Sequence, residues 1–172
     1  SIGIATIIAL GAVMSGMTIG MEGMLKTGKA DFSVAQSGVS DLSFSKIDEN
    51  RTREIGMLEG VENTAGVLIG IFPIEDHPYV LAWGVRQEDL QMLGVDIVNG
   101  SSFSQEHDLI IGEVLSKEIH KGIGDKLTLR QEEFNITGVF ETGSVYQDRG
   151  LAFSLRKLQE MEKKEGWVYT TC

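Results

Sequence analysis

A segment with glycines and lysines, GMLKTGKA at residues 23–30, comes closest in this sequence to a motif with defined chemistry. It nearly matches the loop that binds nucleotide phosphates, in which a hydroxyl residue after the lysine holds Mg²⁺. Ala30 stands at that position and has no hydroxyl group. The motif also needs a strand before it and a helix after it, whereas this segment follows an uncharged run and precedes residues of alternating polarity. We therefore expect a connector here and no nucleotide site.

The other side chains that commonly do chemistry are scattered along the chain. His77, His107 and His120 lack the i,i+4 spacing that places two imidazoles on one helix face. No G-x-S-x-G sequence marks an activated serine, and Cys172 lies in no sequence context typical of a reactive thiol. We therefore expect no catalytic residue, no metal and no cofactor in this chain, and no enzymatic activity.

The charge balance excludes one class of partner. The 172-residue chain has a formal charge of −10, and no run of Lys or Arg offsets it locally. Such a field repels phosphate backbones, so nucleic acid is not an expected partner. The length suits one ordinary domain or two small subdomains. With a single cysteine, no intrachain disulfide supports the fold.

Residues 1–21 contain no charged side chain. About 20 apolar residues suffice for a helix to cross the hydrocarbon layer, so we expect residues 1–22 to be part of a first transmembrane helix, in contact with membrane lipid. Gly16 and Gly20 would form a face that lets another helix approach closely. The alternatives are a signal peptide, for which no basic segment or cleavage site is visible, and a buried core helix, for which so long an uncharged run is unusual.

Beyond the connector, hydrophobic periodicity and turn residues predict a series of short strands and helices. The two prolines, Pro73 and Pro78, are expected to break the chain between two strands. The expected strands are a stretch around Phe32 and Val34, then residues 64–72, 79–85, 108–111, 126–130, 134–142, 151–153 and a last one from Trp167; the expected helices are residues 45–58, 86–93, 113–120 and a final one capped by Ser154.

This order of elements predicts an α+β fold with mixed or antiparallel sheets and short helices, preceded by the transmembrane helix. We expect two lobes, one from residues 30–76 and 131–172 and the other from residues 77–130. Most aromatic residues in the expected strands should be core, namely Phe32, Phe72, Trp83, Phe134, Phe140 and Phe153. The run Ile71, Phe72, Pro73 is the exception, because a hydrophobic strand that ends at a proline turn could expose an apolar contact for a partner or substrate.

Several sequence segments, taken in order, resemble the MacB-like periplasmic core domain of ABC-transporter permeases of the MacB, FtsX and LolC type. The resemblance covers nearly the whole chain after the apolar run, but Gly100 is followed by Ser101 where the family usually has arginine. The segments that carry it are WGV at residues 83–85, NGSSFS at 99–104, DLIIG at 108–112, GDKLTL at 124–129, FNITGVF at 134–140 and FSL at 153–155.

The resemblance implies an outer domain, residues 30–172, on the extracytoplasmic side of the cell membrane. It implies a permease subunit that pairs with a second, identical or different, permease subunit and with a separate or fused cytoplasmic ABC ATPase, which would bind the ATP. Closure of the ATPase would be transmitted mechanically to the outer domain for export or extraction of a hydrophobic compound, peptide or lipoprotein. The substrate itself stays open.

Two other classes remain as alternatives. An FtsX-like subunit would regulate a cell-wall hydrolase through protein contact and transport nothing. A membrane-tethered sensor or binding module would have no ATPase at all. Further apolar spans after Cys172 and a neighbouring ATPase gene would favour a permease.

Overall fold

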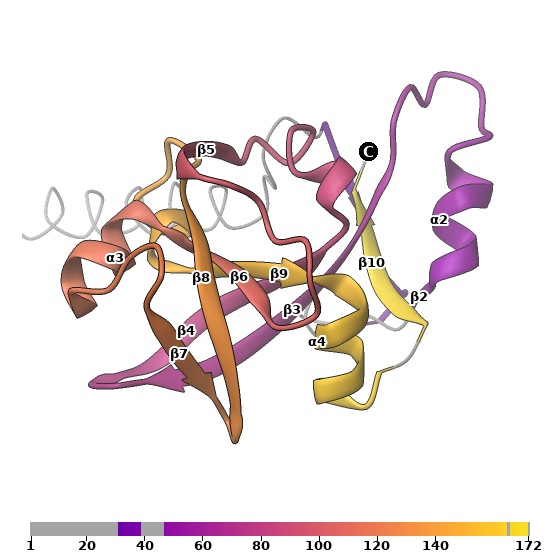
Figure 1. Ribbon diagram of the computed structural model, residues 1–172. Coiled ribbons are helices and arrows are strands. Elements are labelled where there is room, and N and C mark those ends of the chain that lie inside the picture. Colours follow the sequence, from indigo (N-terminus) through magenta and orange to yellow (C-terminus); the bar gives the residue numbers. More distant parts are fainter. Residues whose placement is uncertain (1–30, 39–46, 165, 172) are drawn as a thin grey trace, which may run out of the picture.

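The computed structural model describes residues 31–38, 47–164 and 166–171 (Figure 1). No helix within these residues is long and apolar enough to cross a membrane. The expected transmembrane helix, its Gly16 and Gly20 face and the connector at residues 23–30 lie outside the described residues.

The regular structure of the described residues is mainly strand, with short helices. The strands are β1 (Ser33–Val34), β2 (Ile47–Asp48), β3 (Ala65–Ile74), β4 (His77–Val85), β5 (Asp96–Gly100), β6 (Asp108–Gly112), β7 (Lys126–Leu129), β8 (Glu132–Glu141), β9 (Leu151–Ser154) and β10 (Trp167–Thr171). The helices are α2 (Glu49–Ile55), α3 (Glu113–Ile119) and α4 (Leu155–Glu162), with 3₁₀ turns η2 (Gln87–Asp89) and η3 (Gln147–Arg149). The α+β class expected from the sequence is confirmed.

One mixed sheet runs through the described residues in the order β1-β10-β3-β4-β9-β6-β8-β5, with β2 beside β10 and β7 beside β8. The pairs β4–β9 and β6–β8 are parallel and the others are antiparallel. The structure does not show the two expected lobes. Strand β9, assigned to one lobe, lies hydrogen-bonded between β4 and β6, assigned to the other, so the sheet crosses the expected boundary.

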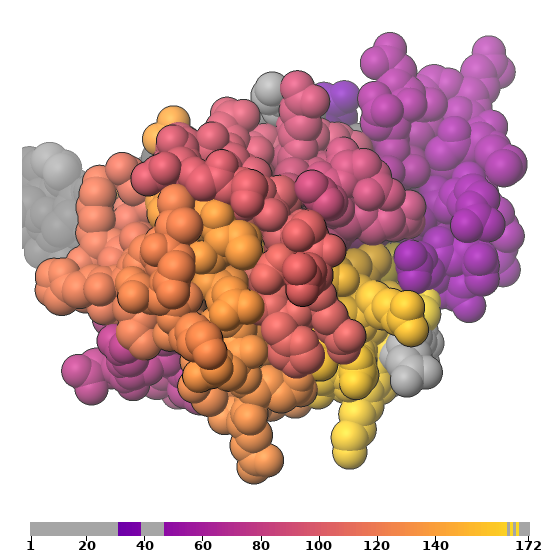
Figure 2. Space-filling model, viewed as in Figure 1, coloured from indigo at the N-terminus to yellow at the C-terminus, as the bar shows by residue number. Residues whose placement is uncertain are grey.

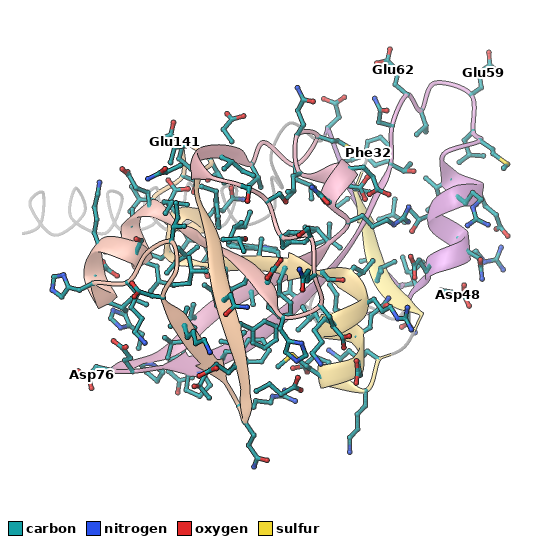
Figure 3. All side chains as sticks on the ribbon, in the orientation of Figure 1. Phe32, Asp48, Glu59, Glu62, Asp76 and Glu141 are labelled. Carbon is teal, nitrogen blue, oxygen red and sulfur yellow. The ribbon has the colours of Figure 1, made fainter. Side chains whose placement is uncertain are left out.

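The expected strand break at the prolines is wrong. Strand β3 continues through Pro73, and β4 begins before Pro78, so that only Glu75 and Asp76 form the turn. The β3–β4 register shifts between Phe72 and Ile74, and a shifted register is where a sheet accepts a residue without an N–H donor. The result is one long hairpin, whose tip carries Asp76 and projects from the body (Figures 2 and 3).

Hydrophobic side chains fill both faces of the sheet. One cluster packs Phe72, Phe134 and Phe153 against Leu158 of α4, and the other packs Phe140 against Leu93 and Phe103 from the segment between β4 and β6. Helix α4 lies very close to the β3–β4 hairpin, because a Cβ atom on Gly70 or Gly84 would come within 2.9 Å of Leu158. Such contacts leave no room for a side chain at either position.

Two other expectations need correction. Phe32 was expected in the core, but it lies just before β1 and is exposed. Helix α2 begins after Asp48, whose carboxylate accepts a hydrogen bond from the Asn50 amide, and ends at Ile55 rather than at residue 58. The helix therefore begins later than residue 45, the start expected from the sequence, because the Asp48 side chain caps the first free amide groups.

Candidate functional site: an apolar strip on the β3–β4 hairpin

One face of the β3–β4 hairpin carries a row of apolar side chains. Successive residues of a strand point to opposite faces, and Ile71 pairs with Leu81 while Ile69 pairs with Trp83. We call the side chains on this face the contact strip: Ile69, Ile71, Pro73, Tyr79, Leu81 and Trp83. Ile71 is 52% exposed and Tyr79 is 82% exposed, so the outer half of the strip lies open to solvent.

The three residues singled out from the sequence fall on different faces. Ile71 and Pro73 are exposed on the strip. Phe72 lies between them, points to the other face and is fully buried, with its ring 6.2 Å from that of Phe153 in an edge contact. Phe72 therefore anchors the strand while Ile71 and Pro73 present surface, and the contact role itself stays a prediction.

Sequence reasoning missed the second half of the strip. Tyr79 and Leu81 come from β4 and lie beside Ile71 only because the hairpin turn has two residues. The apolar alternation of Tyr79, Leu81 and Trp83 was the signal that could have revealed them. The expected strand break at Pro73 and Pro78 separates this strand from Ile71, so the sequence does not predict that the two rows lie side by side.

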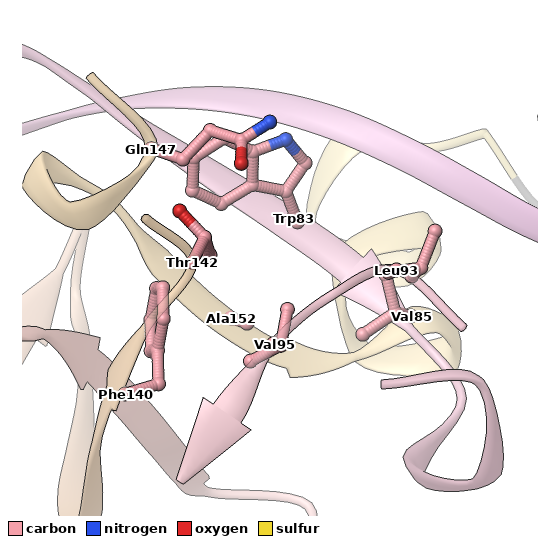
Figure 4. Close-up of a pocket in the computed structure, with 8 residues that line it drawn as sticks. All are labelled: Trp83, Val85, Leu93, Val95, Phe140, Thr142, Gln147 and Ala152. Carbon is pink, nitrogen blue, oxygen red and sulfur yellow. The ribbon is translucent and has the colours of Figure 1, made fainter. Parts of the chain in front are cut away.

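The inner end of the strip opens into a small apolar cavity beside Trp83 (Figure 4). Its volume is about 20 Å³, and its walls come from β4, β8, β9, η3 and the chain before β5. The lining residues are Trp83, Val85, Leu93, Val95, Phe140, Thr142, Gln147 and Ala152. A space of this size with mostly apolar walls suits a methyl-sized group rather than a polar ligand.

The wall of this cavity is fixed by the loop that joins β8 to β9. The buried Asp148 carboxylate accepts hydrogen bonds from both the amide and the hydroxyl group of Thr142, at 2.7 and 2.8 Å. Gly150 lies against the Trp83 ring, where an added Cβ would be 2.2 Å from a ring carbon. Only glycine allows this approach, so the indole is held in one place at the inner end of the strip.

Polar contacts hold the outer end of the hairpin against α3 and η3. Lys121 pairs with Glu75 at 3.2 Å, and the imidazole of His77 lies 3.5 Å from the Glu118 carboxylate. Glu118 also accepts a hydrogen bond from Arg149 at 3.0 Å. The tip is therefore tethered on one side, while Ile71 and Tyr79 at the outer half of the contact strip stay exposed.

The histidines take no part in a metal site among the described residues, where no group of three or more metal-binding side chains occurs. His77 belongs to the hairpin tip, and His107 lies 3.2 Å from Glu132. His120 ends α3 in the left-handed conformation.

A buried lysine forms the centre of a second polar cluster. The Lys157 side chain of α4 is 4% exposed, and its ammonium group lies 2.6 Å from Glu132, 3.3 Å from Glu106 and 3.7 Å from Glu160. Burial disfavours the charge, but the hydrogen bonds to Glu132 and Glu106 outweigh it and raise the pKa of Lys157. The hydrogen bond from Lys157 in turn lowers the pKa of Glu132.

This cluster lies on the wall of an open polar groove of about 690 Å³ between η2 and the first turns of α4. Carboxylates and basic groups both line it, and Arg86 pairs with Glu49 across 3.6 Å. Because acidic and basic side chains both line the groove, it offers no charge of one sign for a ligand. The contact strip is therefore the better candidate for a functional surface.

Known proteins resemble this chain in fold. The periplasmic region of MacB from Actinobacillus actinomycetemcomitans has 11% sequence identity and a TM-score of 0.58, over 73% of this chain and 64% of that one. The extracellular domain of the noncanonic ABC-type transporter YknZ from Gram-positive bacteria has 10% identity and a TM-score of 0.61, over 81% of this chain and 79% of that one. This chain thus spans less than two thirds of the MacB periplasmic region.

No curated protein sequence matches the chain. A family model does: the description "MacB-like periplasmic core domain" applies to residues 1–171. The match extends over almost the full sequence and agrees with the fold of both solved structures. The chain therefore belongs to the family of MacB-like periplasmic core domains.

Proposed function

We propose that this chain is the outer domain of a permease subunit that uses ATP hydrolysis by a cytoplasmic ABC ATPase, on a separate or fused chain. Residues 1–22 would anchor it in the cell membrane, and residues 30–172 would lie on the extracytoplasmic side. A second permease subunit would complete the assembly. The assembly would export or extract a hydrophobic compound, peptide or lipoprotein. Family membership supports this proposal.

The observation that carries the proposal is the contact strip. An exposed row of apolar side chains on a soluble domain marks a surface that meets another molecule. Ile71 and Tyr79 stand on strands whose opposite face is buried core, through Phe72 and Val80. The strip is thus both apolar and firmly supported, which suits a surface that must move or hold a hydrophobic cargo.

The ends of the described domain suit attachment to a membrane. Ser33 of β1 pairs with Thr171 of β10, so the first and last described strands are neighbours in the sheet. A domain built in this way can be inserted between two neighbouring membrane helices. Movement of those helices would then reach the sheet through β1 and β10.

Labelling in intact cells tests the location. In full-length protein with Cys172→Ser, we expect Tyr79→Cys to react with a membrane-impermeant maleimide added outside the cytoplasmic membrane. Val80→Cys is the matched control, because Val80 neighbours Tyr79 in β4 but is buried. Reaction of Tyr79→Cys only after cell lysis would place the domain in the cytoplasm and refute the proposal. Purification of the labelled protein should also recover an ABC ATPase, and its absence would favour a tethered binding module.

A further inference from the structure

Arg130 occupies a position that arginine rarely takes. It is the first of two residues, Arg130 and Gln131, in the turn between the paired residues Leu129 and Glu132. Its backbone has φ of +57°, in the left-handed region. Asparagine, aspartate and glycine are the usual residues at such a hairpin position, because other side chains are strained there. An arginine at this position suggests that its side chain offsets the backbone strain.

The Arg130 side chain makes three contacts across the fold. One guanidinium nitrogen donates a hydrogen bond to the carbonyl oxygen of Met161 at 2.5 Å, and another pairs with Glu162. Both partners lie in the last turn of α4, where backbone carbonyls have no partner within the helix. The guanidinium carbon also lies 5.4 Å from the centre of the Phe72 ring, within the range of a cation–π interaction.

These contacts join two parts of the molecule that matter for the contact strip. Phe72 lies on the inner face of β3, directly behind the exposed Ile71 and Pro73. Helix α4 leads into β10, which pairs with β1 where the chain enters the sheet. A single side chain thus touches the strand that bears the strip and the helix that leads into β10, the last described strand. Lys157 ties the same turn to α4 a second time through Glu132.

We propose that Arg130 is a positioning residue that couples α4 to the β3–β4 hairpin, so that these two elements move together. The importance of this coupling for transport rests on the proposed function. If the proposed function holds, motion of β1 and β10 would reach the contact strip through α4. The coupling itself is a property of the resting domain and needs no ATP.

Hydrogen exchange in the full-length protein, embedded in lipid nanodiscs without nucleotide, tests the coupling. We expect Arg130→Met to speed exchange about tenfold both in α4 and at the outer end of the β3–β4 hairpin, because both elements lose a charge-assisted or cation–π contact. Lys126→Met is the matched control. It removes a cation whose exposure, 56%, is close to the 48% of Arg130, from the same β7–β8 hairpin. Its partner Glu133 lies within that hairpin, so exchange should change only there.

Two further variants separate the side chain from the turn. Arg130→Gly relieves the backbone strain yet should speed exchange in both elements as Arg130→Met does. Arg130→Lys keeps the charge and should restore part of the protection. If Arg130→Gly behaves like the parent protein, or if faster exchange is confined to the β7–β8 turn, the coupling is refuted. That result would leave the labelling at Tyr79 unaffected, so failure of this inference and failure of the proposed function are distinguishable.

Discussion

The ammonium group of Lys157 lies 2.6 Å from the Glu132 carboxylate, although the two residues differ greatly in exposure: the Lys157 side chain is 4% exposed and that of Glu132 is 39% exposed. The cost of breaking the pair should therefore depend on which partner is removed. A buried charge that loses its partner is destabilising, whereas an exposed carboxylate recovers its hydration.

We expect Glu132→Gln to lower the free energy of unfolding by about 1–3 kcal/mol, since Lys157 keeps only Glu106 and Glu160. Lys157→Met should cost less, under about 1 kcal/mol, because the methionine fills the same apolar space and leaves carboxylates that water can reach. Urea unfolding of the two variants measures the difference, with Glu133→Gln as an exposed control. The opposite order would show that the ammonium group is effectively solvated.

The same pair predicts a pH dependence. Because the folded-state pKa of Glu132 lies below its ordinary value of 4.5, its stabilising effect is present above that value and is lost as the pH falls through the lowered pKa. The folded-state pKa of Lys157 lies above 10.5, so its effect is present below that value and is lost as the pH rises through the raised pKa.

In urea unfolding across the pH range, the contribution of Glu132 to the free energy of unfolding should therefore be constant from above pH 4.5 up to the alkaline pH at which Lys157 loses its proton. Glu132→Gln should flatten the acid arm of the stability curve. An acid arm of unchanged steepness in that variant would mean that other carboxylates carry the acid sensitivity.

The two faces of the β3–β4 hairpin should respond differently to mutation. Ile71→Ser and Tyr79→Ser should each change the free energy of unfolding by less than about 0.5 kcal/mol, as is usual for exposed positions. Phe72→Ala should cost about 3–5 kcal/mol, because it removes a fully buried ring. Thermal unfolding compares the three variants. A large loss on Ile71→Ser would indicate that the strip is covered within the protein and is not a contact surface.

How much of this architecture the sequence predicts depends on whether the signal is local. Strand β6 and the hairpin β7–β8 were predicted because a buried apolar run and an alternating pattern mark them directly. Strand β5 was missed, because all five of its residues are exposed and it lies at the sheet edge with no burial pattern. The expected strand break at Pro73 and Pro78 was wrong, because whether a strand tolerates a proline depends on the register of its partner strand.

The candidate site follows the same rule. Ile71 and Pro73 were found from a local apolar run that ends at a proline. Tyr79 required the pairing of β3 with β4, and the contact of Arg130 with Met161 joins residues 31 positions apart. Contacts of this kind depend on the three-dimensional arrangement of the strands. The pattern of residues along a single sequence does not reveal that arrangement.

Bulk at Gly16 and Gly20 should matter if residues 1–22 form a packed membrane helix. In lipid, helices associate through close backbone contact at small residues, because the hydrophobic effect does not drive them together. We expect Gly16→Leu combined with Gly20→Leu to impair assembly of the full-length permease. Cross-linking in membranes measures assembly, with Ile7→Leu as a control that adds no bulk. A chain beginning at Ala30 should stay soluble and folded. If it does not fold, residues 1–22 belong to the domain core.

The most direct test asks whether ATP hydrolysis changes the surroundings of the contact strip. The reaction rate of Tyr79→Cys with a maleimide should be measured in full-length protein carrying Cys172→Ser, reconstituted with its ATPase in lipid vesicles with the outer domain facing outward. We predict that ATP changes this rate several-fold, and that an ATPase variant unable to hydrolyse ATP abolishes the change. Equal rates with and without hydrolysis, in a preparation whose ATPase is active, would contradict the account.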